Sequence, residues 1–190
     1  MDLGIMRLRK PLKITVKEEN KMEAIKALLT RRSIRKYTAQ EVPQEITREL
    51  LNAGMHAPTA RNHQPWHFVV VDKREILDAL SVAHPYAKML TQATLAILVC
   101  GDKSIQEAEG YIVQDCSAAT QNIMLAAHAH GLGSVWLGMY PREERMQKLS
   151  ELLDIPDHIL PVALIAIGYP DEIKEAPDRY KEERVHWNKF

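Results

Sequence analysis

The fold is indicated most clearly by residues 111–138, which read YIVQDCSAATQNIMLAAHAHGLGSVWLG. Up to His130 the apolar side chains are spread around most of the circumference of a helix, and Gly131 marks its end. Residues 134–137 then read as a short strand. One small domain rarely encloses so long a helix on all sides. We therefore expect a second subunit to cover part of it, and the many small residues permit that close approach.

The segments on either side predict further elements. We expect helices at 22–32, 43–55, 72–83 and 141–153, and strands at 67–71, 95–100 and 162–167. Strands interspersed with helices in unequal measure favour an α+β fold over a regular βαβ alternation.

The composition excludes several classes of protein. With 25 Lys and Arg against 25 Asp and Glu, and 46% hydrophobic residues, the chain fits neither a disordered protein nor a charge-driven nucleic-acid binder. The longest apolar runs, 95–100 and 162–167, are too short to cross a membrane. No apolar segment of signal-peptide length follows the basic N-terminus. We expect a cytoplasmic protein with no nucleic-acid or membrane partner.

Common catalytic and metal motifs are missing from the sequence. GxGxxG, GxxxxGK[ST], HExxH and GxSxG do not occur. His128 and His130 are two apart on a helix and point to different sides, which disfavours a zinc pair. Cys100 and Cys116 form no CxxC pair and are expected to be buried. We therefore expect no metal site and no protein side chain acting as catalytic acid, base or nucleophile.

Three other segments carry candidate binding chemistry. Residues 31–37, RRSIRKY, offer guanidinium groups that can bind phosphate oxygens bidentately, although such a run also suits a solvated helix end. Residues 57–66, APTARNHQPW, form a rigid polar loop suited to the edge of a flat heterocycle. Residues 131–138 end in a glycine-flanked strand whose N–H groups could reach the same ring. Each alone can be a structural turn, and their joint occurrence favours a binding site.

These segments, in this order and together with the tail DRYKEERVHWNKF at 178–190, resemble the FMN-dependent nitroreductase family, in its small single-domain branch, over residues 22–190. The resemblance implies a nitroreductase-like α+β fold with a central mixed β-sheet flanked by helices, and an intertwined homodimer that holds FMN between its subunits. It divides the chain into an N-terminal extension, 1–21, a nitroreductase-like domain, 22–168, and a C-terminal extension, 169–190, that wraps the partner subunit.

The resemblance also assigns cofactor-binding residues. Phosphate and ribityl contacts fall on Arg31, Arg32, Ser33 and Arg35, with a further tail cation that is either Arg179 or Arg184. The segment along the isoalloxazine ring falls on Pro58, Thr59, Ala60 and Asn62, with Gln64 reaching the site. Backbone near the flavin N5 falls on Gly138 and Met139, and a cation near the pyrimidine end falls on Lys88. The family's asparagine beside that cation is replaced by Pro85, which leaves the N1 side of the ring unassigned.

The implied activity is that of an FMN-dependent NAD(P)H oxidoreductase that reduces nitroaromatics or quinones by ping-pong hydride and electron transfer. Two alternatives stay open. One is a specialised flavoprotein of the same fold, either a reductive dehalogenase or a flavin-fragmenting enzyme. The other is a non-enzymatic flavin- or anion-binding protein. The choice between NADH and NADPH also stays open. The aromatic residues of the tail, Tyr180, Trp187 and Phe190, are expected to dock on another surface.

Overall fold

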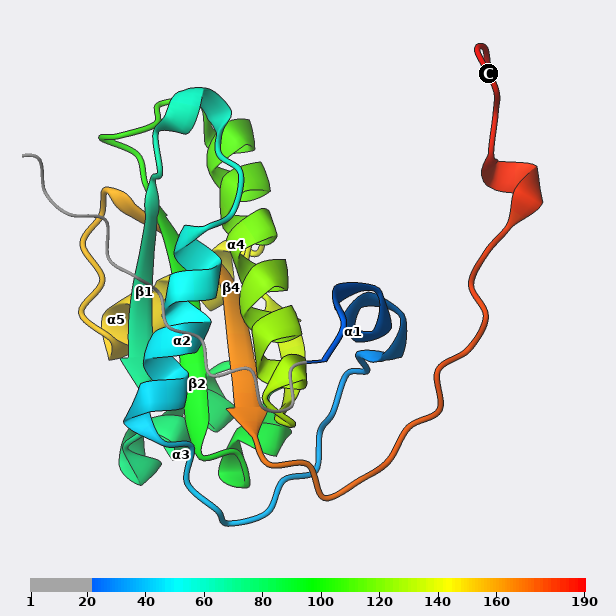
Figure 1. Cartoon of the computed structure of the whole chain (residues 1–190). Helices are drawn as coiled ribbons and strands as arrows, with labels where there is room; N and C mark the ends of the chain where they lie inside the picture. Colours follow the sequence, from blue (N-terminus) through cyan, green and yellow to red (C-terminus); the bar gives the residue numbers. More distant parts are fainter. Residues whose placement is uncertain (1–21) are drawn as a thin grey trace, which may run out of the picture.

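A computed structural model describes residues 22–190, so the predicted N-terminal extension at 1–21 lies outside the described residues (Figure 1). The elements, in chain order, are α1 (Ala24–Thr30), α2 (Gln44–Met55), η1 (Ala60–Asn62), β1 (Trp66–Val71), α3 (Arg74–Ala83), η2 (Lys88–Thr91), β2 (Leu95–Asp102), α4 (Glu109–Ala129), β3 (Gly133–Gly138), α5 (Glu143–Leu152), β4 (Ile159–Gly168) and η3 (Glu182–Arg184). Every helix and strand predicted above is present, with ends shifted by a few residues.

The four strands form one sheet in the order β1-β2-β4-β3, and all three strand pairs are antiparallel. The expectation was a mixed sheet. Within the described chain the parallel component is an isolated bridge between Ser33 and Ser134, which joins the segment after α1 to the start of β3. The last strand in sequence, β4, lies between β2 and β3, so the most C-terminal strand occupies a central position in the sheet.

Helices cover both faces of the sheet, because the two central strands are apolar on both sides. In β2, Leu98 and Cys100 point to one core, and Ile97 and Val99 point to the other. The first core is completed by α3, η2 and α5, and the second by α2 and α4. Figure 1 shows α2 and α4 together on one side of the strands. Strands buried on both faces read as continuous apolar runs, which is why 95–100 shows no alternation.

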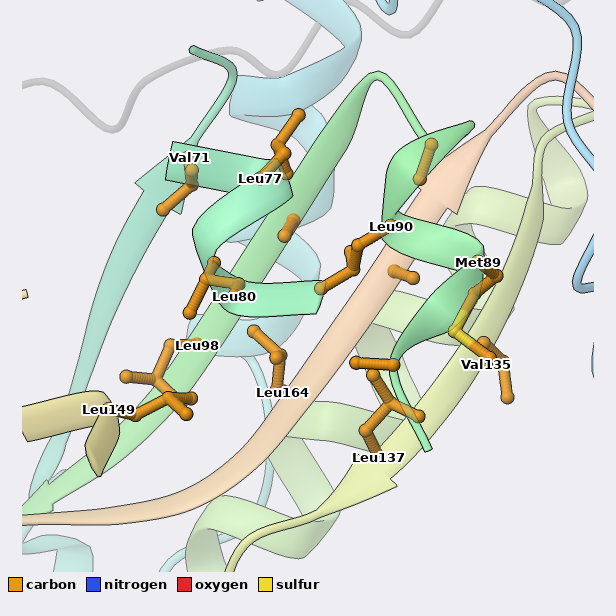
Figure 2. Packing of buried hydrophobic residues seen from close by; sticks show 14 of the residues in the cluster. Val71, Leu77, Leu80, Met89, Leu90, Leu98, Val135, Leu137, Leu149 and Leu164 are labelled. Carbon is orange, nitrogen blue, oxygen red and sulfur yellow. The ribbon is translucent and has the colours of Figure 1, made fainter. Parts of the chain in front are cut away.

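The α3 core is shown in Figure 2. Leu77 and Leu80 from α3 lie over Leu98 of β2 and Leu164 of β4, and all four side chains are at most 1% exposed. Met89 of η2 reaches toward β3 in the same view. The short helix η2 therefore packs directly on the sheet.

Two parts of the chain lie outside these cores. Helix α1 stands to one side of the sheet, and Ile25 and Leu29 on it are 67% and 65% exposed (Figure 1). The tail after β4 runs away from the domain, and Trp187 is 81% exposed. Docking of the tail aromatics on another surface stays a prediction. Among the described residues, no helix is both long and apolar enough to span a membrane.

We predict that Gly101→Ala lowers the free energy of unfolding by about 3 kcal/mol, the upper end for overpacking. An added Cβ at Gly101 would lie 2.0 Å from Cγ2 of Ile112, so β2 and α4 would have to separate. The matched control is Gly110→Ala, since a Cβ at Gly110 meets nothing within 4 Å. Within α4 this control should raise stability by about 0.5–1 kcal/mol. Urea unfolding of both variants measures the difference, and equal midpoints would contradict the described packing.

Candidate functional site

The segment 31–37 is attached to the start of β3. The backbone N–H of Ile34 donates to the carbonyl of Ser134 over 3.0 Å, next to the bridge between Ser33 and Ser134. A Cβ at Gly133 would lie 2.7 Å from Ile34, so glycine is what permits this close approach. The predicted phosphate-binding residues are thereby fixed against the sheet.

Positive groups gather at this point. Arg31 and Arg32 are half-buried. The pKa of Arg31 is lowered, mainly by burial and then by the charges of Arg32 and Arg179. Burial, Arg31 and Arg32 likewise lower the pKa of His128, whose Nε2 lies 2.8 Å from the Thr30 hydroxyl. We call Arg31, Arg32 and Arg179 the cation cluster.

Polar atoms beside the cation cluster lack partners. Arg31 Nη1, Arg32 Nη1 and Ser134 Oγ are buried and have no hydrogen-bond partner among the described residues. A buried donor without a partner costs free energy, and a charged one costs more. An anion bound beside Arg31 and Arg32 would accept hydrogen bonds from their guanidinium groups and reduce the repulsion between them. Within residues 22–190, no group of His, Cys, Asp and Glu side chains could hold a metal ion.

The other predicted phosphate residues differ in placement. Arg35 is exposed, and its backbone N–H donates to Oε1 of Glu172 over 2.6 Å. Lys174 donates to the carbonyl of Ser33 over 2.8 Å, so the start of the tail is tied to the same segment. Of the two tail candidates, Arg179 acts on Arg31 through its charge, whereas Arg184 lies farther along, at the end of η3. The structure thus favours Arg179 as the tail cation.

The loop after α2 is held by one buried carboxylate. Asp115 of α4 is 5% exposed and accepts the Thr59 hydroxyl over 2.7 Å and the Ala60 N–H over 3.1 Å. Thr59 Oγ1 in turn accepts the N–H of Gln64 over 3.0 Å. These bonds leave Pro58 exposed at the start of the loop.

The far side of this loop has a constrained backbone. Arg61, Asn62 and Gln64 have φ angles of 53°, 57° and 50°, in the left-handed region that non-glycine residues rarely adopt. The amide of Gln64 donates to Oδ1 of Asn62 over 2.9 Å, and both side chains are exposed. Such conformations persist where the surroundings over-determine them, and they cluster at ligand sites.

The predicted ring contacts Gly138, Met139 and Lys88 lie near β3, an edge strand of the sheet: Met139 belongs to the α3 core, as do Met89 and Leu90 of η2, and Gly138 is the last residue of β3. Gly138 is exposed at the end of β3, and a Cβ there would meet nothing within 4 Å. Met139 is fully buried, so only its backbone could face a ligand. Lys88 is exposed at the first position of η2. The open backbone at Gly138 leaves room for a flat ligand.

One chain brings together only part of the predicted site. The cation cluster lies beside Ser134, near the start of β3, and Gly138 ends this strand about 13 Å farther along by strand geometry. The loop at Pro58–Gln64 is elsewhere. Its anchor Asp115 lies about 20 Å along α4 from His128, and its flanking residues Ala57 and Trp66 belong to the α2 and α4 core.

Several residues at the site were not predicted from the sequence, namely Asp115, His128 and Ser134, together with His84 and Arg145, whose Nε2 and Nη1 lie 3.2 Å and 3.1 Å from the Gly138 carbonyl. Asp115 carries a usable signal, since a lone carboxylate in an otherwise apolar helix must have partners when buried. For His128 the sequence raises only the possibility of a zinc ligand, which its spacing to His130 disfavours. The others carry no local pattern, because their partners lie far away in the sequence.

Replacing the loop's anchor should loosen the loop while keeping the fold. We predict that Asp115→Asn lowers the free energy of unfolding by about 1.5–3 kcal/mol, since hydrogen bonds to a charged group are lost. The free energy of local opening, measured by hydrogen exchange at the Ala60 amide, should fall by a similar amount. The control is Gln114→Ala, an exposed neighbour on α4, which should stay within about 0.5 kcal/mol. Unchanged exchange at Ala60 would contradict the anchoring role.

Comparison with known proteins places the sequence and the fold in a known family. The model of the nitroreductase family matches residues 28–84 and 78–169. A protein of Methanothermobacter thermautotrophicus named "Putative NADH dehydrogenase/NAD(P)H nitroreductase" is 44% identical over 182 residues, covering 94% of this chain and 95% of that protein. The structure of an FMN-dependent nitroreductase from Clostridium difficile R20291 is similar with a TM-score of 0.81 at 34% identity, covering 87% of this chain and 99% of the other.

A third similarity is to the NADPH:FMN oxidoreductase from Vibrio harveyi, whose structure is a complex with NAD+. The TM-score is 0.78 at 25% identity, with 88% of this chain and 77% of the other covered. The family model matches well over half of the sequence, and the archaeal relative is similar from end to end. This chain belongs to the nitroreductase family.

Proposed function

We propose that this protein is an FMN-dependent NAD(P)H oxidoreductase that reduces nitroaromatics or quinones. The names of its relatives support the cofactor and the nicotinamide donor. The observation that carries the proposal is the set of buried, unpartnered donors on Arg31, Arg32 and Ser134. They lie at the opposite end of β3 from an exposed glycine backbone, as an elongated ligand with one anionic end requires.

The chain's residues would then divide the work of binding. Arg31, Arg32, Ser33 and Arg179 hold the phosphate, and the backbone at Gly138 and Met139 borders the ring. Lys88 places a positive charge at the pyrimidine end, which favours a reduced, anionic ring. Bound FMN supplies the redox chemistry, since it accepts a hydride from a nicotinamide and passes electrons to a second substrate. The protein's tasks are to bind, to orient and to leave one ring face open.

A homodimer completes the site in this proposal. The loop at Pro58–Gln64 leads into β1, at the opposite edge of the sheet from β3 and Gly138, so a second copy would supply it to the ring. The exposed apolar residues of α1 and the tail support this, because such surfaces on a single chain mark contacts with other molecules. We assign residues 22–168 to the domain and 169–190 to an extension that wraps the partner.

The direct test is titration of the apoprotein with FMN, followed by anaerobic addition of NADH or NADPH. We expect a yellow complex whose visible absorbance bleaches. Nitrofurans and quinones should reoxidise it, whereas turnover only of halotyrosines would favour a dehalogenase. Protein that stays colourless at saturating FMN would overturn the proposal.

The Arg31→Ala variant should separate phosphate recognition from ring recognition. Loss of one charged hydrogen-bond donor is expected to weaken FMN binding by about 10- to 150-fold. Riboflavin, which lacks the phosphate, should bind this variant and the unmodified protein equally. Lys26→Ala, which removes an exposed charge from α1, is the control and should bind FMN normally. Fluorescence titration measures all five affinities, and a parallel loss of riboflavin binding would refute the phosphate role.

Truncation before Asp178 tests the role of the tail. The tail beyond Pro177 is exposed throughout, so the shortened chain should keep its far-ultraviolet circular dichroism and its cores. We expect a weaker dimer by analytical ultracentrifugation and weaker FMN binding, since Arg179 is lost too. A truncated chain that stays dimeric and binds FMN as tightly as the full chain would contradict a crossing tail.

A further inference from the structure

The carbonyl of Gly138 receives hydrogen bonds from two side chains that no step above has used. Nε2 of His84 lies 3.2 Å from this oxygen, and Nη1 of Arg145 lies 3.1 Å from it. Gly138 has no side chain to restrict its backbone, so the two donors restrict it instead. His84 is 1% exposed although its ring is polar, and a buried histidine must have such partners.

The protonation state of His84 follows from its two contacts. Its Nδ1 accepts the backbone N–H of Tyr86 over 3.2 Å, so Nδ1 carries no proton. Nε2 therefore carries the proton and donates it to the Gly138 carbonyl. Burial is the main cause that lowers the pKa of His84. The charge of Arg145 lowers it further, and the bond to Gly138 opposes both. The ring stays neutral and keeps one fixed tautomer.

Tyr86 and Arg145 complete a ring of contacts. The guanidinium carbon of Arg145 lies 5.3 Å from the centre of the Tyr86 ring, within the range of a cation–π interaction. The rings of Tyr86 and His84 meet edge to face with centres 6.2 Å apart. Each member of this set, His84, Tyr86, Arg145 and Gly138, is thus positioned by two others.

His84 also sets the position of Lys88. It is the C-terminal cap of α3, and its carbonyl accepts the N–H of Ala87 over 3.0 Å. The carbonyl of Ala87 in turn accepts the N–H of Leu90. Leu90 is the third residue of η2, and Lys88 is the first. The side chain of His84 therefore reaches Gly138, while its backbone begins the turn that carries Lys88.

We propose that His84 is a positioning residue for the flavin ring: it holds the Gly138 backbone and Lys88 in a fixed relation to each other, and Arg145 supports it. The inference rests on the proposed function, in which both groups border the ring. A shift of the backbone beside the reacting atom would impair hydride transfer more than binding, because FMN affinity depends chiefly on the distant cation cluster.

The experiment compares His84→Phe with His84→Gln in FMN-loaded protein. Phenylalanine fills the same space without either hydrogen bond, whereas glutamine keeps an N–H donor. We expect His84→Phe to slow single-turnover reduction by NADH about 10- to 100-fold. FMN Kd should change less than about 3-fold, the visible spectrum of the bound FMN should shift, and His84→Gln should recover most of the rate.

A second variant keeps the test decisive if His84→Phe does not fold. Arg145→Met removes the other donor from a half-buried position on α5 and should also slow reduction. Lys148→Met removes a cation of the same helix that pairs with Glu144, so its rate should match that of the unmodified protein. Equal reduction rates for His84→Phe or Arg145→Met and the unmodified protein would overturn this inference and leave the proposed function intact. Failure of the unmodified apoprotein to bind FMN would instead overturn the proposed function.

Discussion

Burial of both faces of β2 and β4 is the constraint on which the rest of this molecule depends. Every residue of β2 and all but the first of β4 are buried, so neither strand can present a polar side chain to solvent or ligand. Charged groups are confined to the ends of strands and to the segments packed on them. The polar features described above follow this rule, from the cation cluster at the start of β3 to Gly138 at its end.

Helix α4 spaces the parts of the candidate site. His128 in its last turn faces the cation cluster, and Asp115 nearer its start anchors the loop at Pro58–Gln64. A rigid helix holds these two regions at a constant separation, and the strands β2 and β4 lie between β1, into which the loop leads, and β3 with Gly138. A single chain therefore offers two half-sites of different chemistry. One is the cation cluster together with the exposed backbone at Gly138, and the other is the polar loop at Pro58–Gln64 with its restrained backbone. This division is the physical basis for proposing a site shared between two copies.

The sequence predicted the elements well and their arrangement poorly, for identifiable reasons. Helical spacing located α1 to α5, and continuous apolar runs located β2 and β4. Strand order was not predictable, because the pairing of β4 with both β2 and β3 depends on contacts between distant residues. The continuous apolar character of β2 shows that it is buried without showing which residues face which core.

Prediction of the candidate site shows the same division. The segments 31–37 and 57–66 were identifiable from their residue types, and their family resemblance pointed to phosphate and ring contacts. Asp115, Ser134 and His84 were missed, because each acts on a partner far away in the chain. No sequence pattern around His84 marks its bond to Gly138. Supporting contacts of this kind become visible only in three dimensions.

The central place of β4 has a consequence for biosynthesis. On the ribosome, β1, β2 and β3 emerge before the strand that joins them. The nascent chain can therefore form the antiparallel β1–β2 pair, while β3 has no partner strand and both of its backbone edges are unpaired. Non-local pairing of this kind folds slowly and leaves such edges open to association. The strand β4 completes the sheet only after residue 168 has left the ribosome, and until then the growing polypeptide is open to association with its neighbours.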